Sequence, residues 1–202
     1  MIKQIKVGAL STNCYIVYDN DEAIVIDPGY IDERITDFID ENKLRVKLIY
    51  LTHCHFDHIL GAKWLKEKYD ADIACIDKEA DNVNDERVNL SLQMTGERFT
   101  IKCDKVFFEN DEIEVGRLNF KVIHTPGHTS GGSTLYGEGI LISGDTLFSD
   151  CFGRCDLPTS NISQIIKSIK EKLYVLPPET IVYPGHGDST TVGKSNVFED
   201  EF

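Results

Sequence analysis

The sequence predicts one α+β domain in which helices cover packed β-sheets. Short apolar runs rich in β-branched residues recur along all 202 residues, and most of them end at Gly, Pro, Asp or Asn, which are typical of turns. Amphipathic helical patterns occur in both halves of the chain, but strand-like runs outnumber them. No repeat, low-complexity tract or linker interrupts this pattern, so residues 1–202 form a single predicted domain.

The N-terminal half alternates predicted strands with two predicted helices. Residues 31–42 carry apolar side chains at helical spacing, and residues 59–69 form the second helix. The sequence Asp27-Pro28-Gly29 is a turn signal that ends the third strand. The predicted strands of this half are residues 2–7, 14–18, 23–26, 47–52 and 72–76.

Residues 77–96 are polar and weakly periodic, and they indicate a helix with a loop. A long irregular insert in a compact domain is often a lid that faces the substrate. A solvated connection fits the composition equally well, so both interpretations stand at this stage.

The C-terminal half contains more strands and one clear helix. Residues 133–136 and 140–142 form a predicted hairpin across Gly137-Glu138-Gly139. Residues 162–173 carry Ile and Leu at helical spacing. The remaining predicted strands are residues 105–108, 112–115, 118–123 and 180–183.

The charge balance argues against a nucleic-acid partner. The chain has 21 Lys and Arg against 34 Asp and Glu, a net charge of −13, whereas nucleic-acid binding needs a basic surface. No apolar run approaches the roughly 20 residues that cross a bilayer. Residues 1–6 lack the apolar centre of a signal peptide. We therefore expect a cytoplasmic enzyme with a small-molecule substrate and no membrane partner.

The six cysteines are expected to be free thiols, because no export signal indicates an oxidising compartment. They form no Cys-x-x-Cys pair, which disfavours a structural zinc site. Cys151 and Cys155 lie four residues apart, and the pattern favours two ordinary loop thiols over a redox or accessory-metal pair.

All six histidines lie at or beside the ends of predicted strands, in segments that also carry Asp. In an extended segment, His53, His55 and Asp57 would share one face. Histidines and aspartates gathered in this way point to metal binding. The candidate ligands are His53, His55, Asp57, His58, His128, Asp145 and His186.

Seven ligands are more than one tetrahedral ion accepts, which indicates two ions. Three private ligands for each ion and one shared carboxylate use all seven. A water molecule between two such ions has a lowered pKa and becomes a hydroxide nucleophile near neutral pH. Hydrolysis of an activated acyl compound is the expected reaction, with Asp57 and Asp145 holding and orienting the hydroxide.

The combined motifs resemble the metallo-β-lactamase superfamily, and within it the glyoxalase II (hydroxyacylglutathione hydrolase)-like branch. The resemblance covers nearly the whole chain and implies an αβ/βα four-layer sandwich of two mixed sheets, with the ions at one edge. It rests on Asn13-Cys14-Tyr15-Ile16-Val17, Ile26-Asp27-Pro28-Gly29, Thr52 to His58, His124-Thr125-Pro126-Gly127-His128-Thr129, Gly144-Asp145-Thr146-Leu147-Phe148, Gly153-Arg154-Cys155-Asp156-Leu157-Pro158 and Pro184-Gly185-His186-Gly187.

The resemblance also implies a role for each residue of the site. It assigns His53, His55 and His128 to the first ion, Asp57, His58 and His186 to the second, and Asp145 to both. His124 aligns with a residue that is not a ligand, so we expect it to support the ligands from outside or to pack. Asp27 is expected to support the site, and Cys54 to be buried filler that faces away from the metals. Zinc is the expected metal, although His and Asp also accept iron and manganese.

One departure concerns the substrate. Glyoxalase II enzymes hold glutathione with an extra C-terminal helical region, whereas only 16 residues follow His186 here, as in compact single-domain members. The predicted substrate is a thioester such as a hydroxyacylglutathione, similar to S-lactoylglutathione, and the thiol carrier stays open. Arg154 is a candidate contact for a substrate carboxylate, and an ion pair with Asp156 is an equal alternative.

Other functions fit the same fold. A persulfide dioxygenase-like enzyme would need only two His and one Asp on a single iron, so the complete second set favours a dinuclear hydrolase. Hydrolysis of a lactone or a β-lactam on the same metals is a further alternative. The acidity argues against a ribonuclease, and the complete ligand set argues against a mere binding module.

Overall fold

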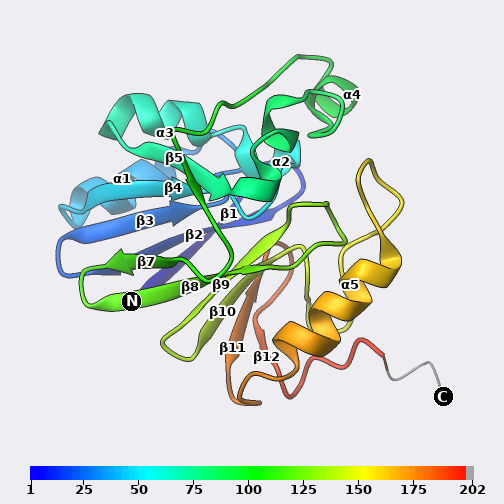
Figure 1. Ribbon diagram of the computed structural model, residues 1–202. Coiled ribbons are helices and arrows are strands. Elements are labelled where there is room, and N and C mark those ends of the chain that lie inside the picture. Colours follow the sequence, from blue (N-terminus) through cyan, green and yellow to red (C-terminus); the bar gives the residue numbers. More distant parts are fainter. Residues whose placement is uncertain (199–202) are drawn as a thin grey trace.

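The computed structural model, which describes residues 1–198, contains two six-stranded sheets packed face to face (Figure 1). In sheet A, β1 and β2 pair antiparallel, as do β2 and β3, while β3 to β6 run parallel. The strands of sheet A, in order across it, are β1 (Ile2–Val7), β2 (Thr12–Asp19), β3 (Glu22–Ile26), β4 (Arg45–Tyr50), β5 (Asp72–Ile76) and β6 (Lys105–Phe107).

Sheet B is mixed as well. Its neighbours pair antiparallel except β10 and β11, which run parallel. The strands of sheet B, in order across it, are β12 (Thr190–Thr191), β11 (Ile181–Pro184), β10 (Ile140–Gly144), β9 (Ser133–Gly137), β8 (Leu118–His124) and β7 (Glu112–Val115). The predicted hairpin is therefore confirmed as β9 and β10.

Three hydrophobic clusters separate the four layers. Along β2, Cys14 and Ile16 face the helices on the outer side of sheet A, whereas Tyr15 and Val17 face sheet B. This alternation follows from the two-residue period of a strand. Leu141 of β10 belongs to the third cluster, on the outer side of sheet B. The predicted αβ/βα sandwich of two mixed sheets is confirmed.

Helices cover both outer faces. α1 (Glu33–Glu41) and α3 (Ala62–Tyr69) pack on sheet A, and α5 (Ile162–Ser168), extended by the π-helical turn η3 (Ile169–Leu173), packs on sheet B. The Asp32 side chain caps α1 by accepting a hydrogen bond from the Arg34 amide at 3.0 Å. None of the helices in residues 1–198 is long and apolar enough to cross a membrane.

The predicted helix at residues 59–69 is divided in two. The short helix α2 (Phe56–Ile59) ends before Gly61, and α3 begins after it. Gly61 packs against the turn that follows β3, where a Cβ atom would lie 2.5 Å from the Tyr30 carbonyl oxygen. This tertiary contact interrupts the helix, and helical periodicity alone could not predict it.

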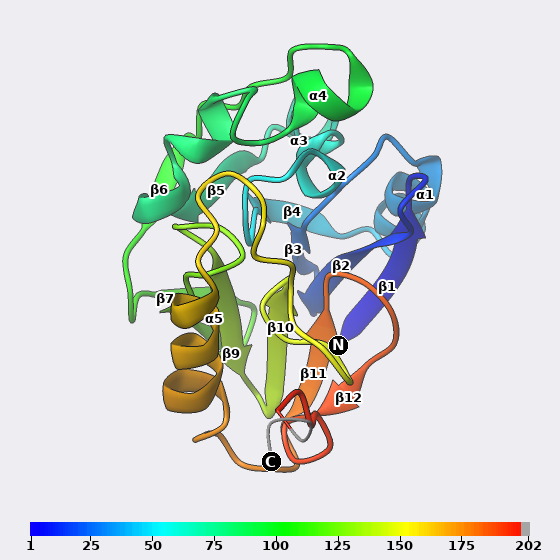
Figure 2. The same cartoon turned by 90° about the vertical axis from the view of Figure 1, so that its right-hand side faces the viewer.

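The segment that the sequence left ambiguous forms an insert at one edge of the sheets. It contains two short turns, η1 (Asp77–Glu79) and η2 (Asn82–Asn84), and the helix α4 (Ser91–Thr95). Figure 2 looks onto this edge and shows the insert above the loop that follows β10. The predicted helix at residues 162–173 is confirmed as α5 and η3, although the sequence pattern does not show that its last turn is π-helical. The strand β12 was not predicted, because its two residues are too few to show a pattern.

Candidate metal centre

The seven candidate ligands converge where the carboxyl ends of several strands meet. His53 and His55 follow β4, His128 follows β8, Asp145 follows β10, and His186 follows β11. Backbone hydrogen bonds join the two sheets at this edge, from Ser133 N to Thr52 O at 2.9 Å and from Asn13 N to Gly185 O at 2.7 Å.

The ligands form two groups. His53, His55 and His128 offer donor atoms within 4.8 Å of one another, and so do Asp57, His58 and His186. Each group can therefore hold one ion.

Asp145 lies between these groups. Its carboxylate oxygens are 3.5 Å from His128 Nε2, 3.5 Å from His58 Nε2 and 3.6 Å from His186 Nε2. The structure thus has the two-group arrangement, with one carboxylate between the groups, that the ligand count predicts.

The prediction that His53, His55 and Asp57 share one face of an extended segment is wrong for Asp57. Asp57 lies in the first turn of α2 and not in an extended segment, because the chain turns after His55. Asp57 consequently joins His186, at 3.2 Å from Asp57 Oδ2 to His186 Nε2.

Backbone carbonyls and a carboxylate orient the imidazoles. His128 Nδ1 donates to Arg154 O at 2.8 Å, and His186 Nδ1 donates to Leu10 O at 3.2 Å. His58 Nδ1 lies 2.9 Å from Asp27 Oδ2. With Nδ1 occupied, Nε2 of each ring faces the other ligands, and such outer partners hold a ligand in the tautomer that binds metal.

Asp27 supports the site, as predicted. Asp27, His53 and His58 also form a third group whose potential ligand atoms lie within 4.8 Å of one another. Asp27 Oδ1 accepts from Thr52 N at 2.8 Å, and Asp27 Oδ2 accepts from Thr52 Oγ1 at 2.6 Å. Since His58 occupies the same Oδ2, the oxygens of Asp27 are already in use, and we assign it to support and not to ligation.

The electrostatics differ between the two groups. Burial and neighbouring imidazoles lower the pKa of His53, and burial lowers that of His55, so both rings are neutral and present lone pairs. Burial also acts to lower the pKa of His58, but the surrounding carboxylates, led by Asp145 and Asp57, outweigh it and raise the pKa to about 10. Neutral imidazoles beside clustered carboxylates form an environment that attracts cations.

These residues fit a pair of divalent ions. His53 Nε2 and Asp145 Oδ1 are buried and have no hydrogen-bond partner within residues 1–198, although buried polar atoms are normally paired. Gly185 keeps the space open, since a Cβ atom there would lie 2.1 Å from Asp145 Oδ1 and 2.7 Å from His58 Cε1. Metal ligation would satisfy both unpaired atoms.

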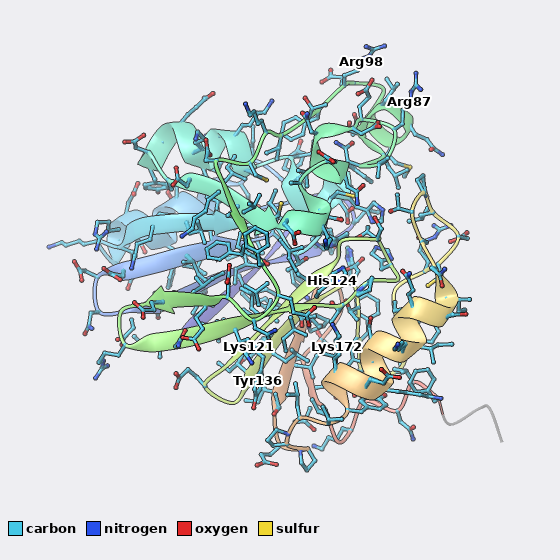
Figure 3. All side chains as sticks on the ribbon, in the orientation of Figure 1. Arg87, Arg98, Lys121, His124, Tyr136 and Lys172 are labelled. Atoms are coloured by element: carbon cyan, nitrogen blue, oxygen red, sulfur yellow. The ribbon has the colours of Figure 1, made fainter. Side chains whose placement is uncertain are left out.

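His124 and Arg154 take positions outside the ligand groups. His124 Nε2 is 3.1 Å from Ser130 O, and Lys172 Nζ of η3 donates to His124 O of β8 at 2.7 Å (Figure 3). These contacts indicate a packing role. The Arg154 guanidinium pairs with Asp156 at 2.7 Å, which is the second of its two sequence alternatives.

The cysteines agree with their predictions. All six are free thiols, and the Cys54 side chain is fully buried in the cluster between sheet A and its helices. Cys151 and Cys155 are unpaired in the loop after β10.

A cleft of about 330 Å³ opens directly over the ligands. His55, Asp57, His128, Asp145 and His186 line its floor. Its apolar walls come from the N-terminal segment, α2, the insert and the loop after β10, and they consist of Leu10, Phe56, Leu90, Met94, Phe148 and Leu157. The insert therefore borders the cleft, which supports the lid interpretation over a solvated connection.

Sequence reasoning missed the outer partners of the ligands. Thr12, Leu10 and Glu79 contact the site or its loops from segments with no local signal of function. Arg154 lay within a motif, but its contact with a ligand is made by the backbone carbonyl, which accepts from His128 Nδ1.

Comparison with known proteins agrees with this geometry. The family model of the metallo-beta-lactamase superfamily matches residues 7–186. This chain belongs to the metallo-β-lactamase superfamily, and the fold and the match define a metal-dependent hydrolase.

Two relatives match over nearly their whole lengths. The probable metallo-hydrolase YqgX of Bacillus subtilis is 34% identical, over 94% of this chain and 92% of its own. The hydroxyacylglutathione hydrolase GloC of Haemophilus influenzae is 34% identical, over 98% of this chain and 97% of its own. The chain is thus similar in extent to compact members of the superfamily.

Solved structures share the fold. The BLEG-1 B3 metallo-beta-lactamase has a TM-score of 0.90 at 35% identity, covering 96% of this chain and 95% of its own. TTHA1623 in a di-iron-bound form has a TM-score of 0.84 at 31% identity, with coverages of 97% and 99%. ETHE1 from Myxococcus xanthus has a TM-score of 0.76 at 27% identity, with coverages of 96% and 80%.

Proposed function

We propose that this protein hydrolyses a small-molecule acyl thioester, such as a hydroxyacylglutathione similar to S-lactoylglutathione, with the help of two divalent ions. The observation that carries the proposal is the cleft with apolar walls directly over both ligand groups. The similarity to a hydroxyacylglutathione hydrolase along nearly the whole chain supports it.

The residues that would hold the ions are those of the two groups. His53, His55 and His128 would bind the first ion, Asp57, His58 and His186 the second, and Asp145 both. Zinc is the metal we expect, and the di-iron form of a similar protein keeps iron as an alternative. When bound, such ions act as Lewis acids on the scissile carbonyl and lower the pKa of bound water.

The chain's own carboxylates orient the attacking water. Burial acts to raise the pKa of Asp57, but the neighbouring His58 and His186 outweigh it and hold the pKa well below its usual value. Thr12 Oγ1 donates to Asp57 Oδ2 at 3.0 Å, which fixes the rotation of this carboxylate. Asp57 therefore stays ionised and can accept a hydrogen bond from water without a separate general base.

The walls of the cleft would bind the organic part of the substrate. Phe56, Leu90, Met94 and Phe148 offer apolar surface to an acyl group and its thiol carrier. Ordered apolar walls also exclude bulk water, which strengthens the electrostatic interactions at the floor.

Two alternatives remain from the same similarities. The similarity to ETHE1 is consistent with a persulfide dioxygenase-like iron enzyme. The similarity to the BLEG-1 lactamase is consistent with hydrolysis of a β-lactam or a lactone. The complete Asp57, His58 and His186 group favours the dinuclear hydrolase over a single-iron enzyme.

One experiment separates these functions. The purified protein is analysed for zinc, iron and manganese, and then assayed with acyl-glutathione thioesters, lactones, β-lactams and, with an oxygen electrode, glutathione persulfide. We expect two ions per chain and turnover of thioesters. Oxygen uptake with the persulfide, or turnover of lactones or β-lactams without thioester cleavage, would reject the proposal.

A further inference from the structure

Glu79 is a buried carboxylate beside the metal centre that is not one of the seven candidate ligands. It ends η1, and its relative exposure is 0%. Within residues 1–198 its hydrogen-bond partners are uncharged groups. Burying a carboxylate costs free energy unless hydrogen-bond donors surround it. The donors that contact Glu79 therefore fix its position.

The first donor lies between two ligands. Cys54 N donates to Glu79 Oε1 at 2.8 Å. Cys54 separates His53 from His55, so this hydrogen bond restrains the backbone from which both imidazoles project. The contact does not depend on the thiol of Cys54.

The second oxygen faces the loop that carries His128. Asn82 Nδ2 donates to Glu79 Oε2 at 2.7 Å and lies 3.0 Å from Ser130 Oγ. A Cβ atom on Gly131 would lie 2.3 Å from Glu79 Oε2, so the loop packs on the carboxylate without a gap. Glu79 therefore touches the two loops that supply the first ligand group.

The sheet topology explains this position. β4 and β5 are parallel neighbours, so their carboxyl ends meet at one edge, and Leu51 N donates to Ala74 O at 2.9 Å there. Glu79 follows β5 as His53 follows β4. The second ligand group has different supports, namely Asp27 on His58, Thr12 on Asp57 and the Leu10 carbonyl on His186.

We propose that Glu79 is a positioning residue for the first ion, which aligns His53, His55 and His128 through Cys54 N and Asn82 and leaves the second group unaffected. This inference rests on the proposed two-ion site, but it does not depend on the identity of the substrate.

The test is the metal content of Glu79→Gln after dialysis against a metal-buffered solution. The oxygen of the new amide can keep the Cys54 hydrogen bond, but its nitrogen no longer accepts from Asn82 Nδ2, so Asn82 must reorient and lose its present contacts with position 79 and Ser130. We expect affinity for one of the two ions to fall on the order of 10- to 100-fold, the range seen when an outer partner of a ligand is lost. Cobalt(II) absorption of the substituted protein reports the same loss without any assay of turnover.

A rescue variant distinguishes positioning from general stability. In Glu79→Gln/Asn82→Asp, the amide at position 79 again meets an acceptor, so we expect the second ion per chain to return. The matched control is Asn89→Ala, which removes hydrogen bonds to Val83 O in the insert and to Phe99 O just after it. It should lower the melting temperature and keep both ions.

The inference is overturned if Glu79→Gln binds both ions as tightly as the wild type, if it weakens both ions equally, or if the double variant restores neither. Loss of one ion with rescue supports it, even where the wild type cleaves no thioester. That last result would reject the proposed substrate and leave the positioning role intact.

Discussion

The Asp27 carboxylate and the His58 imidazole lie 2.9 Å apart between Oδ2 and Nδ1, and both side chains are buried. Asp27 follows β3 and has a left-handed backbone conformation with φ of 50°. Its oxygens also accept from the amide and hydroxyl of Thr52. One carboxylate thus joins the end of β3, the end of β4 and the helix α2, and it directs His58 Nε2 toward Asp57 and Asp145.

Replacing this support should weaken the second ion. For Asp27→Ala we expect affinity to fall by about 10- to 100-fold, because His58 loses the partner that orients it. Competition with a chromogenic chelator measures the change. Asp188→Ala is the control, since the Asp188 side chain is 94% exposed and should leave binding unchanged. Equal affinities in Asp27→Ala and the wild type would contradict the assigned support.

Asp57→Asn tests the ligand and the water-orienting carboxylate together. An amide lacks the negative charge that the second ion requires, so metal analysis should show reduced occupancy, and turnover should be abolished. Thr12→Val removes only the 3.0 Å hydrogen bond to Asp57 and should have a smaller effect on both readouts. Unchanged metal content and turnover in Asp57→Asn would show that the two-ion assignment is wrong.

Gly185→Ala tests the space between the ligand groups. The added Cβ atom would lie 2.1 Å from Asp145 Oδ1, so the carboxylate must shift, and both metal content and turnover should fall. Gly187→Ala is the matched control, two residues further along, where no atom lies within 4 Å of the added Cβ. The control carries only the strain of its positive φ. If Gly187→Ala lost metal to the same extent, a general disturbance of this loop and not the contact between the added Cβ atom and Asp145 would explain the loss.

Met94→Ala tests the contribution of the insert to substrate binding. Met94 lines the cleft and lies far from the ligand groups in sequence, so we expect KM for the thioester to rise several-fold with kcat nearly unchanged. Val175→Ala removes a comparably exposed apolar side chain outside the cleft and should leave KM unchanged. A loss of kcat with constant KM would place the effect at the reaction centre instead.

A contact between the sheets predicts a pH dependence of stability. Asp19 of β2 accepts from Arg117 N at 3.0 Å, Nε at 2.9 Å and Nη2 at 2.8 Å, and these hydrogen bonds hold the pKa of Asp19 well below its usual range. Because the pKa of Asp19 is lower in the folded than in the unfolded protein, its ionised form stabilises the fold at pH values above the unfolded pKa of about 3.9. This stabilisation is lost as the pH falls toward the pKa of the folded protein.

Arg117→Ala should therefore lower the melting temperature at pH 7, and the difference from the wild type should shrink as the pH drops below about 4. Thermal unfolding followed by circular dichroism at several pH values measures this. Arg98→Ala is the control, since the Arg98 side chain is 75% exposed and its ion pair with Glu86, at 3.7 Å, is longer than the contacts of Arg117. A difference that grew toward low pH would contradict the assigned cause.

Much of the fold was predictable because its signals are local. The alternation of Cys14, Tyr15, Ile16 and Val17 between two cores follows from strand geometry, and the sequence pattern shows it. The division of the second helix at Gly61 was not predictable, because it depends on the Tyr30 carbonyl, which belongs to another segment.

The sequence by itself determined which side chains gather at the centre, since the seven His and Asp residues lie in short segments at the ends of predicted strands and are residue types that bind metal ions. Only the tertiary structure decided what holds and surrounds them. Asp27 and the Arg154 carbonyl contact ligands, and Glu79 contacts the backbone between two of them. Leu90 and Met94 line the cleft. Strand pairing brings these distant segments to one edge. Their roles depend on contacts between residues that are far apart in the sequence, and the spacing of residues along the chain does not reveal such contacts.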